Sequence, residues 1–322
     1  MGLTVTVGLD DAGARLDRLV SATWPAWSRT RWQAAIAAGH VRVNGRPVRR
    51  AGYALTAGDV VHAAAPAEPP SLVLLQHEPL DVAIPIRYRD DVLVVVCKPA
   101  GVVVHPGAGH PHGTLVQALW PDVAAAGGEP GRAGVVHRLD RDTAGLMMLA
   151  RSQMARAALS DALTRRTVHR RYWALVDGHL DPPTGRIEAP IGRDPRHRTR
   201  MAVTVGGRPA ATRYETAARW ARHSWVALEL ETGRTHQVRV HLAAVGHPVV
   251  GDPVYGTGPA LGQTHQALFA YALSFEHPTR RGRHLTLMEP WPERWEDALA
   301  QLGEPEQGAI PPRHTLTPIS SI

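Results

Sequence analysis

The sequence predicts an α+β protein with a small N-terminal domain and a larger domain built on a mixed β-sheet. Two observations support this. A proline-rich stretch, AAAPAEPPS, follows a compact N-terminal segment and is typical of a stiff linker. Beyond it, apolar runs of strand length predominate and helical patterns fall between them irregularly, unlike the strict alternation of a doubly wound parallel sheet. We therefore place the domains at residues 1–64 and 76–302, joined by a linker at 65–75.

The first domain is expected to contain two helices and a small sheet. Apolar spacing over residues 16–20 indicates a first helix, and Ser28 is placed to cap a second helix that ends at Gly39. Residues 41–48, VRVNGRPV, alternate around an Asn-Gly pair, which is a strong signal for a β-hairpin. A last short strand is expected after residues 58–59.

The excess positive charge is concentrated in one segment of this domain, residues 14–50. The formal net charge is +7, and residues 14–50 hold eight arginines against one acid, so the rest of the chain sums to zero. Such a patch is typical of a surface that binds a polyanion, most often nucleic acid. Because Lys98 is the only lysine, arginine is the general choice of this chain, and the clustering is more informative than the residue type.

The order helix, helix, Asn-Gly hairpin, strand resembles the small RNA-binding domain first recognised in a ribosomal small-subunit protein, here called the S-four-like domain. That resemblance implies that residues 1–64 bind RNA. The contacts are expected from the clustered arginines, which are Arg15, Arg18, Arg29, Arg31, Arg42, Arg46, Arg49 and Arg50.

The larger domain shows strand signals interrupted by two clear helical ones. Ser152 is placed to cap a helix with Met154 among its apolar positions. Thr235 is placed to cap another, with Leu242 and Val245 on its buried stripe. The strands are expected at residues 92–97, 146–149, 172–176 and 225–230, and residues 303–322 are expected to form a disordered tail.

Composition argues against several protein classes. The longest clean apolar run, residues 92–97, is far shorter than the ~20 residues of a membrane helix. The N-terminus shows no pattern of a secretory or import signal. Cys97 is the only cysteine, which excludes an internal disulfide and fits a reducing compartment. We expect a cytoplasmic monomer that does not bind membranes.

A short charged stretch stands out in the larger domain. Residues 134–150, GVVHRLDRDTAGLMMLA, place two arginines and two aspartates within five positions between apolar residues. A surface turn with an Arg-Asp pair would account for the pattern without any function. The paired carboxylates of a glycoside hydrolase fit poorly, because they flank a sugar bond at roughly 5 to 9 Å and usually come from separate elements. A single aspartate kept ionised by arginines explains why cations surround the acid.

The charged stretch resembles the signature of the RluA-type pseudouridine synthases, commonly written HRLDxxTSGL. The similarity continues in order from about Arg15 to Pro290. It implies a catalytic domain with a mixed, mainly antiparallel sheet that isomerises uridines of large-subunit ribosomal RNA. Two departures are Ala144, where serine is common, and Arg151, where lysine is frequent. The matching segments are HRLDRDTAGL at 137–146, KPAG at 98–101, HPG at 105–107, RYWALVDG at 171–178, GRTHQVRVHL at 233–242, GHP at 246–248 and GDPVYG at 251–256.

The resemblance also implies roles for individual residues. Asp140 corresponds to the essential aspartate, which attacks ribose or base or assists cleavage of the glycosidic bond. Arg239 corresponds to a basic residue that pairs with Asp140 and holds it charged and oriented. Tyr172 corresponds to a tyrosine that stacks on uracil and whose hydroxyl suits proton transfer at C5. The expected substrate contacts are Arg138, which fills the space of the displaced nucleotide or contacts phosphate, Arg234 and Leu242.

Lys98 is a separate inference from composition. A lone lysine in a chain that otherwise uses arginine suggests a site where a compact ammonium fits and a planar guanidinium does not. We expect Lys98 near the cleft, where it contacts RNA phosphate or supports the Asp140 loop.

No cofactor is expected, because the isomerisation involves no net redox change and the chain has no phosphate loop or dinucleotide-binding pattern. His105, His110 and His112 lie in one loop without a nearby carboxylate or thiolate, so no metal site is expected. Two rival functions are a module that binds RNA without catalysis and a carbohydrate hydrolase. The intact set Asp140, Tyr172 and Arg239 argues against the first, and the second requires another carboxylate facing Asp140.

Overall fold

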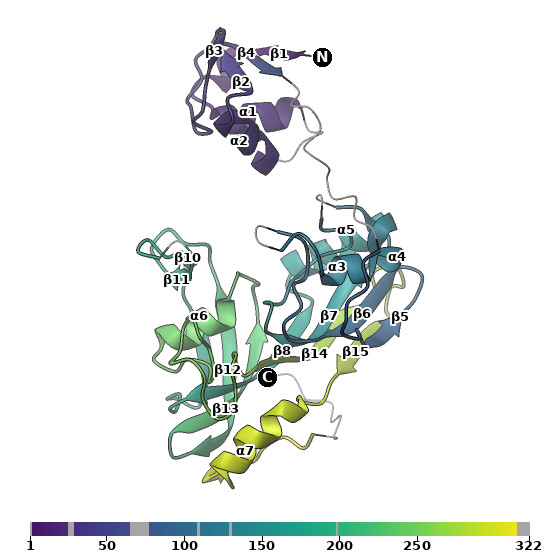
Figure 1. The fold of residues 1–322 in the computed structure, drawn as a ribbon, viewed down its shortest axis with the longest axis vertical. Helices are drawn as coiled ribbons and strands as arrows, with labels where there is room; N and C mark the ends of the chain where they lie inside the picture. Colours follow the sequence, from purple (N-terminus) through teal and green to yellow (C-terminus); the bar gives the residue numbers. More distant parts are fainter. Residues whose placement is uncertain are drawn as a thin grey trace. The chain divides into compact units, whose positions relative to one another are not determined.

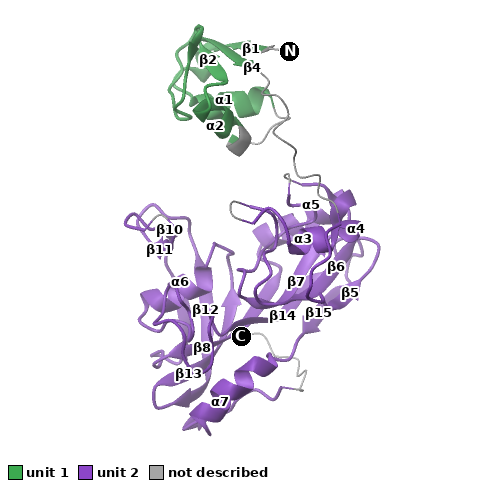
Figure 2. Ribbon diagram, in the orientation of Figure 1, with its two compact units in different colours: residues 1–74 green, residues 75–322 purple. Residues whose placement is uncertain are grey.

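The computed structural model describes residues 2–24, 29–64, 77–107, 110–128, 131–197 and 199–313. It divides the chain into two compact units, residues 1–74 and 75–322 (Figure 2). The predicted linker at 65–75 and the predicted helix cap Ser28 lie outside the described residues.

Unit 1 is a four-stranded antiparallel sheet, in the order β1-β4-β2-β3, with two helices (Figure 1). The predicted helices, hairpin and last strand are confirmed, and Gly39 follows α2 with a φ of 84°. Asn44 and Gly45 adopt φ values of 51° and 80°, which is the geometry of a tight hairpin turn. Strand β1 was not predicted. The elements are β1 (Gly2–Thr6), η1 (Leu9–Asp11), α1 (Leu16–Thr23), α2 (Arg29–Ala37), β2 (Val41–Val43), β3 (Arg46–Pro47) and β4 (Val60–Ala64).

A buried carboxylate joins the two helices of unit 1. Asp17 on α1 is fully buried and accepts hydrogen bonds from Arg15 and Arg29 at 3.0 Å each and from Gln33 at 2.6 Å. Burial alone would raise the pKa of Asp17, but these hydrogen bonds hold it well below its usual range. Two arginines of the predicted RNA patch therefore also stabilise the domain. The other arginines of the patch with described side chains are exposed, namely Arg18, Arg42, Arg46, Arg49 and Arg50; the side chain of Arg31 lies outside the described residues.

Unit 2 contains the remaining elements (Figure 1). Its strands are β5 (Ile86–Arg89), β6 (Leu93–Lys98), β7 (Ala144–Ala150), β8 (His169–Asp177), β9 (Thr184–Glu188), β10 (Ile191–Arg193), β11 (Met201–Val203), β12 (Ala211–Trp220), β13 (His223–Leu230), β14 (Leu268–Glu276), β15 (His284–Met288) and β16 (Gln307–Gly308). Its helices are α3 (Leu115–Ala118), α4 (Trp120–Val123), η2 (Ala124–Ala126), α5 (Gln153–Thr164), α6 (Gln237–Ala244), η3 (Glu293–Trp295) and α7 (Glu296–Leu302).

One ten-stranded sheet organises unit 2. Its path runs β16-β12-β13-β8-β14-β7-β6-β5, with β9 paired to β12 and β15 paired to β14. Among the described strands, β7 and β14 run parallel, and the other pairs are antiparallel. The predicted α+β class with a mixed, mainly antiparallel sheet is confirmed. A separate hairpin, β10-β11, packs beside α6 (Figure 1).

The central strands are apolar at successive positions because both faces of the sheet are covered. Val94 on β6 and Met147 on β7 belong to the main core, whereas Leu93 and Met148 belong to a second cluster that includes residues of α5. Within α5, Ala155 and Leu159 are the buried residues and Met154 is 65% exposed, so the expectation for Met154 was wrong.

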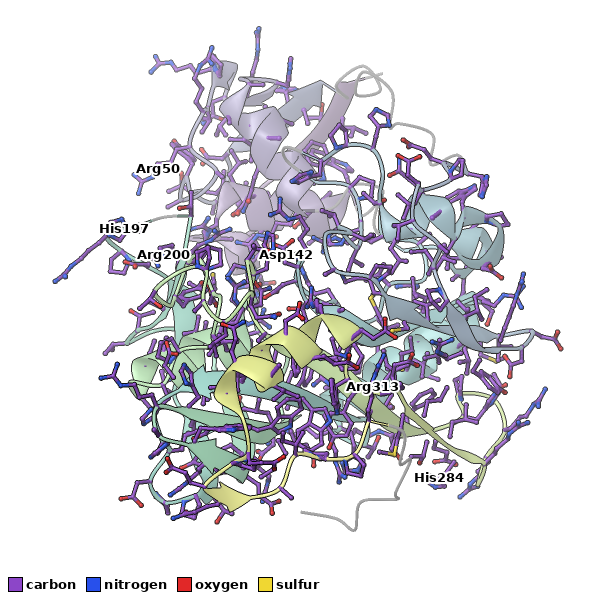
Figure 3. The ribbon with its side chains drawn as sticks, turned by 60° about the horizontal axis from the view of Figure 1, so that its bottom comes forward. Arg50, Asp142, His197, Arg200, His284 and Arg313 are labelled. Carbon is purple, nitrogen blue, oxygen red and sulfur yellow. The ribbon has the colours of Figure 1, made fainter. Side chains whose placement is uncertain are left out.

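The C-terminal segment is packed over much of its length. Residues 303–322 were expected to be disordered, yet β16 pairs with β12 and Arg313 forms ion pairs with Glu293 and Glu296 at 2.8 and 2.6 Å. Figure 3 shows Arg313 alongside α7. The expectation therefore fails for residues 303–313, because backbone pairing and ion pairs hold a segment that has little apolar content. Residues 314–322 lie outside the described part.

Candidate active site

A cavity of about 650 Å³ lies in unit 2, lined by the loop before β7, the C-terminal half of α5, strand β8 and the segment after β13. Asp140 and Tyr172 line it, and both also line an adjoining recess that contains Arg239. Its two carboxylates, Asp140 and Glu231, face an excess of cations, which favours a polyanionic ligand. The arginines that line it are Arg132, Arg138, Arg166, Arg170, Arg208 and Arg234.

The loop that carries Asp140 is fixed from several sides. His137 Nε2 accepts the backbone N–H of Met148 on β7 at 3.1 Å, and Leu139 is buried. Arg141 and Asp142 form an ion pair with each other at 3.0 Å, and neither lines the cavity. The charged stretch therefore separates into a self-paired turn and a part that faces the cavity.

Gly145 lets β7 approach β14 directly after this loop. A Cβ at this position would lie 2.2 Å from the carbonyl oxygen of Ala270, and the φ of Gly145 is 120°. Both features require glycine. The short parallel pairing of these strands thus depends on one glycine, five residues after Asp140.

Asp140 is held by an arginine that is itself held by a second aspartate. Arg239 on α6 donates Nη1–H to Asp140 Oδ2 at 3.0 Å, which confirms the expected pairing. It also donates Nε–H and Nη2–H to Asp252 at 2.6 and 2.9 Å. Asp252 is fully buried and accepts the backbone N–H groups of Val254 and Tyr255 at 2.8 and 3.0 Å.

These contacts fix the charges of the group. Burial alone would lower the pKa of Arg239, but the hydrogen bond to Asp252 and the charges of both aspartates raise it. Burial alone would raise the pKa of Asp252, but Arg239 and the two backbone donors lower it. The guanidinium is therefore a permanent cation, aimed at Asp140 by a bidentate contact on its other edge.

The residue that precedes helix α6 has an unusual backbone conformation. Its first flanking residue, His236, adopts a left-handed conformation with a φ of 57°, so the prediction that Thr235 caps this helix was wrong. The His236 ring bonds the Tyr255 hydroxyl at 2.8 Å, and its Nε2 lies 3.9 Å from Asp140 Oδ1. The strained backbone thus places an imidazole beside the carboxylate.

Tyr172 projects from β8 and lines both the cavity and the recess. It is 5% exposed, and burial raises the pKa of its hydroxyl to about 12. The phenol is therefore neutral at pH 7, with its ring beside the same space that Asp140 faces.

Two predicted substrate contacts are not placed as expected. Lys98 is 0% exposed and donates to the carbonyl oxygens of Pro99, Val102 and Arg141 at 2.7 to 2.8 Å. It supports the Asp140 loop, as one of the two alternatives had it. It is fully buried and lines neither the cavity nor the recess, so the other alternative, contact with RNA phosphate, was wrong. Burial lowers the pKa of Lys98 to about 7.

Leu242 belongs to the main hydrophobic core with 0% exposure and lines neither the cavity nor the recess. Its side chain packs within that core, so its assignment to substrate binding was wrong. Arg138 and Arg234 both line the cavity, and Arg234 Nε also donates to the carbonyl of Pro209 at 3.0 Å.

No role was assigned from the sequence to several residues of the site, among them Arg170, His236, Asp252 and Tyr255. Asp252 and Tyr255 lie in the GDPVYG segment that the sequence had singled out, but nothing in that segment indicated a pairing with α6. Among the described residues, no group of three or more His, Cys, Asp or Glu is placed to hold a metal ion. Likewise, no described helix has both the length and the apolar character to span a membrane.

Comparison with known proteins identifies the family. The sequence model for RNA pseudouridylate synthases matches residues 92–244, and that for the S4 domain matches residues 14–61. An uncharacterized RNA pseudouridine synthase, YlyB, of Bacillus subtilis is 40% identical over 302 residues, which cover 93% of this chain and 98% of the relative. The chain belongs to the RNA pseudouridine synthase family. This enzyme is therefore an isomerase that acts on RNA.

Other relatives of this pseudouridine synthase carry a more specific name. Ribosomal large subunit pseudouridine synthase D of Escherichia coli (strain K12) is 41% identical over 260 residues, which cover 80% of this chain and 77% of the relative. The same name belongs to a relative in Xanthomonas campestris that is 40% identical over 309 residues and covers 91% of this chain and 90% of its own. Human RNA pseudouridylate synthase domain containing 1 shares the fold, with a TM-score of 0.55, 24% identity, and coverage of 76% of this chain and 94% of the human one.

Proposed function

We propose that this pseudouridine synthase isomerises uridines of large-subunit ribosomal RNA and that Asp140 is its essential carboxylate. The observation that carries the proposal is the carboxylate of Asp140 at a basic cavity, bonded at 3.0 Å to an arginine that a buried aspartate holds in place. The names of the relatives from Escherichia coli and Xanthomonas campestris support the choice of RNA. The exposed arginines of unit 1 provide the positive surface that an RNA of this kind requires.

The reaction exchanges one bond to ribose for another. The bond between uracil N1 and ribose C1′ breaks, the base turns, and C5 bonds to C1′; the proton on C5 leaves and N1 gains one. Attack at C1′, attack on the base and electrostatic assistance to cleavage all need an ionised carboxylate at the position of Asp140. Arg239 donates a hydrogen bond to that carboxylate at 3.0 Å and thereby orients it in the site.

In this scheme Tyr172 acts on the uracil base and not on the bond between the base and ribose. Its ring lines the recess beside Asp140, where it is placed to stack on a uracil that has left the RNA helix. Its neutral hydroxyl is suited to relay the proton that C5 gives up. Arg138 is exposed and lines the same cavity, which supports a contact with the RNA that the uracil leaves behind.

The test is release of tritium from unmodified large-subunit ribosomal RNA transcribed with uridine labelled at C5. We expect release by the wild type, none by Asp140→Asn, and near-normal release by Asp142→Asn, which is the matched control because Asp142 does not line the cavity. Equal release by Asp140→Asn would overturn the assignment of the carboxylate.

Two further comparisons decide the substrate. A small-subunit transcript labelled in the same way should release no tritium, and release from it alone would overturn the choice of RNA. Absence of release from either transcript, with binding retained at low salt, would favour a module that binds RNA without catalysis.

A further inference from the structure

Arg170 on β8 is a buried cation without a carboxylate partner among the described residues. It is 7% exposed, its Nε has no hydrogen-bond partner, and no carboxylate of the described residues lies within ion-pair distance of it. Burial lowers its pKa. A buried charge that lacks a counter-ion is strongly unfavourable in a folded protein, so chains rarely keep one without a use for it.

The side chain of Arg170 faces the cavity. Both Arg170 and Tyr172 line it, as expected for residues two apart on one strand, whose side chains lie on the same face about 6.8 Å apart along the strand. Gly233, after β13, lies against the guanidinium, because an added Cβ there would come within 2.7 Å of Arg170 Nη1. The guanidinium is thus enclosed between strand and loop, with the cavity beside it.

A second buried donor lines the same cavity. His137 Nε2 accepts the backbone N–H of Met148, so the proton of the neutral ring is on Nδ1. That Nδ1–H has no hydrogen-bond partner among the described residues. Burial lowers the pKa of His137 to about 3, so the ring stays neutral at pH 7. Arg170 and His137 therefore offer a cation and a neutral donor to a ligand rich in acceptor oxygens.

The carboxylates of the cavity are already committed. Asp140 is paired with Arg239, and Glu231 forms ion pairs with Arg186 and Arg213 at 2.9 Å each and with a third arginine at 3.6 Å. Neither is within ion-pair distance of Arg170. The missing counter-charge must therefore come from the ligand.

We propose that Arg170 and His137 form a subsite for one RNA phosphate next to the uridine that enters the recess. This rests on the proposed function and specifies how the substrate backbone is held. A flipped base remains attached to its backbone, so a phosphate must lie within one nucleotide of the ring that stacks on Tyr172. The non-bridging oxygens of a phosphodiester supply both the negative charge and the acceptors that these two groups lack.

The experiment measures RNA affinity as a function of salt in the full-length protein. Arg170→Met keeps the length and apolar stem of the side chain and removes its charge; Arg170→Lys keeps the charge. The matched control is Arg281→Met, because Arg281 is exposed in the turn between β14 and β15 and does not line the cavity. Dissociation constants for the large-subunit transcript are measured from about 50 to 300 mM KCl, a range over which phosphate contacts change affinity strongly, with each change made in an Asp140→Asn background to prevent turnover.

We expect Arg170→Met to weaken binding by about 10- to 100-fold, as for loss of one hydrogen bond to a charged group. The slope of log affinity against log salt should become shallower by about 0.7 to 0.9, as for loss of one phosphate contact. Arg170→Lys should keep most of the slope, and Arg281→Met should keep the wild-type slope. The melting temperature of Arg170→Met should not fall, because the substitution removes an uncompensated buried charge.

Other results would overturn the subsite. Weaker binding with an unchanged slope would mean that Arg170 contacts an uncharged acceptor such as a uracil carbonyl. A lower melting temperature with unchanged binding would mean that Arg170 is structural. Tritium release by the enzyme with native Asp140 separates these outcomes from failure of the proposed function, since it reports the reaction and not the phosphate contact.

Discussion

Replacing Asp252 by asparagine tests whether a residue outside the cavity controls the reaction. The amide side chain would keep the volume and one acceptor oxygen but would leave Arg239 with Asp140 as its only anionic partner. Breaking one side of a buried ion pair costs about 3–5 kcal/mol, and the retained acceptor places the expected loss of unfolding free energy near the lower end of that range. Since Asp252 is fully buried and lines neither the cavity nor the recess, RNA affinity should not change.

The effect on kcat should exceed what lost stability explains. Without the bidentate contact, Arg239 is free to rotate away from Asp140, and a displacement of about 1 Å at a reacting group costs on the order of 100-fold in rate. Tritium release under saturating RNA, at a temperature where the variant is fully folded, measures kcat, and urea unfolding measures stability. We expect kcat to fall by about this factor with KM unchanged.

Asp90→Asn is the matched control. Asp90 accepts two backbone N–H groups, from Val92 and Leu93, and bonds His277 at 2.6 Å, so its environment is similar to that of Asp252 but lies at the β5-β6 turn. The Asp90→Asn variant should lose about as much unfolding free energy as Asp252→Asn but should keep the wild-type kcat. If Asp252→Asn loses stability and keeps wild-type kcat as Asp90→Asn does, then Asp252 only supports the fold and the positioning argument is refuted.

Three further outcomes are expected. Lys98→Arg should lower activity and should lower the free energy of unfolding by about 1–3 kcal/mol, because a guanidinium overfills a site closed by three carbonyls. Wild-type activity and wild-type stability in this variant would refute that expectation. The pKa of Lys98 falls from 10.5 to about 7 on folding, so the folded state binds fewer protons across that interval. The free energy of unfolding of the wild type should therefore rise relative to that of Lys98→Met as pH rises above about 7, by at most ~1.36 kcal/mol per pH unit. Urea unfolding at several pH values between about 6 and 9 measures this difference, and a difference that does not change with pH would refute the expectation. Tyr172→Phe should lower kcat by about 100-fold or more with little change in RNA affinity, whereas an unchanged kcat in single-turnover assays would show that the hydroxyl moves no proton.

The sequence predicted the elements whose signals are local. The helices of unit 1, the Asn-Gly hairpin and the apolar strands β6 and β7 follow from periodicity and turn chemistry, which act over a few residues. The Thr235 cap failed because a tertiary contact decided the helix start: the His236 ring bonds Tyr255 and holds the backbone in a left-handed conformation that cap preferences do not anticipate. The packed segment 303–313 failed for a similar reason, since its partners lie on β12 and α7.

The sequence predicted only those site residues that lie in recognisable motifs. Asp140 and Arg239 are 99 residues apart, and no spacing rule connects them, so their pairing came from the resemblance alone. Composition marked Lys98 as unusual, but a lysine at a strand end is compatible with either burial or solvent, and only the structure decides between them. Arg170 gave no signal, because one more arginine in an arginine-rich chain is unremarkable until its lack of a counter-ion is visible.

The long separation of Asp140 from its partners also bears on when the enzyme becomes active. Asp252 follows Asp140 by 112 positions in the sequence, and at about 5–20 residues per second the ribosome needs roughly 5 to 20 seconds to synthesise that stretch. During this interval the carboxylate has been made, but Asp252, which anchors Arg239, has not. The basic N-terminal unit, by contrast, is synthesised first and contains its own buried Asp17 network. Under the proposed function, a nascent chain can bind RNA through this unit before the site around Asp140 is complete.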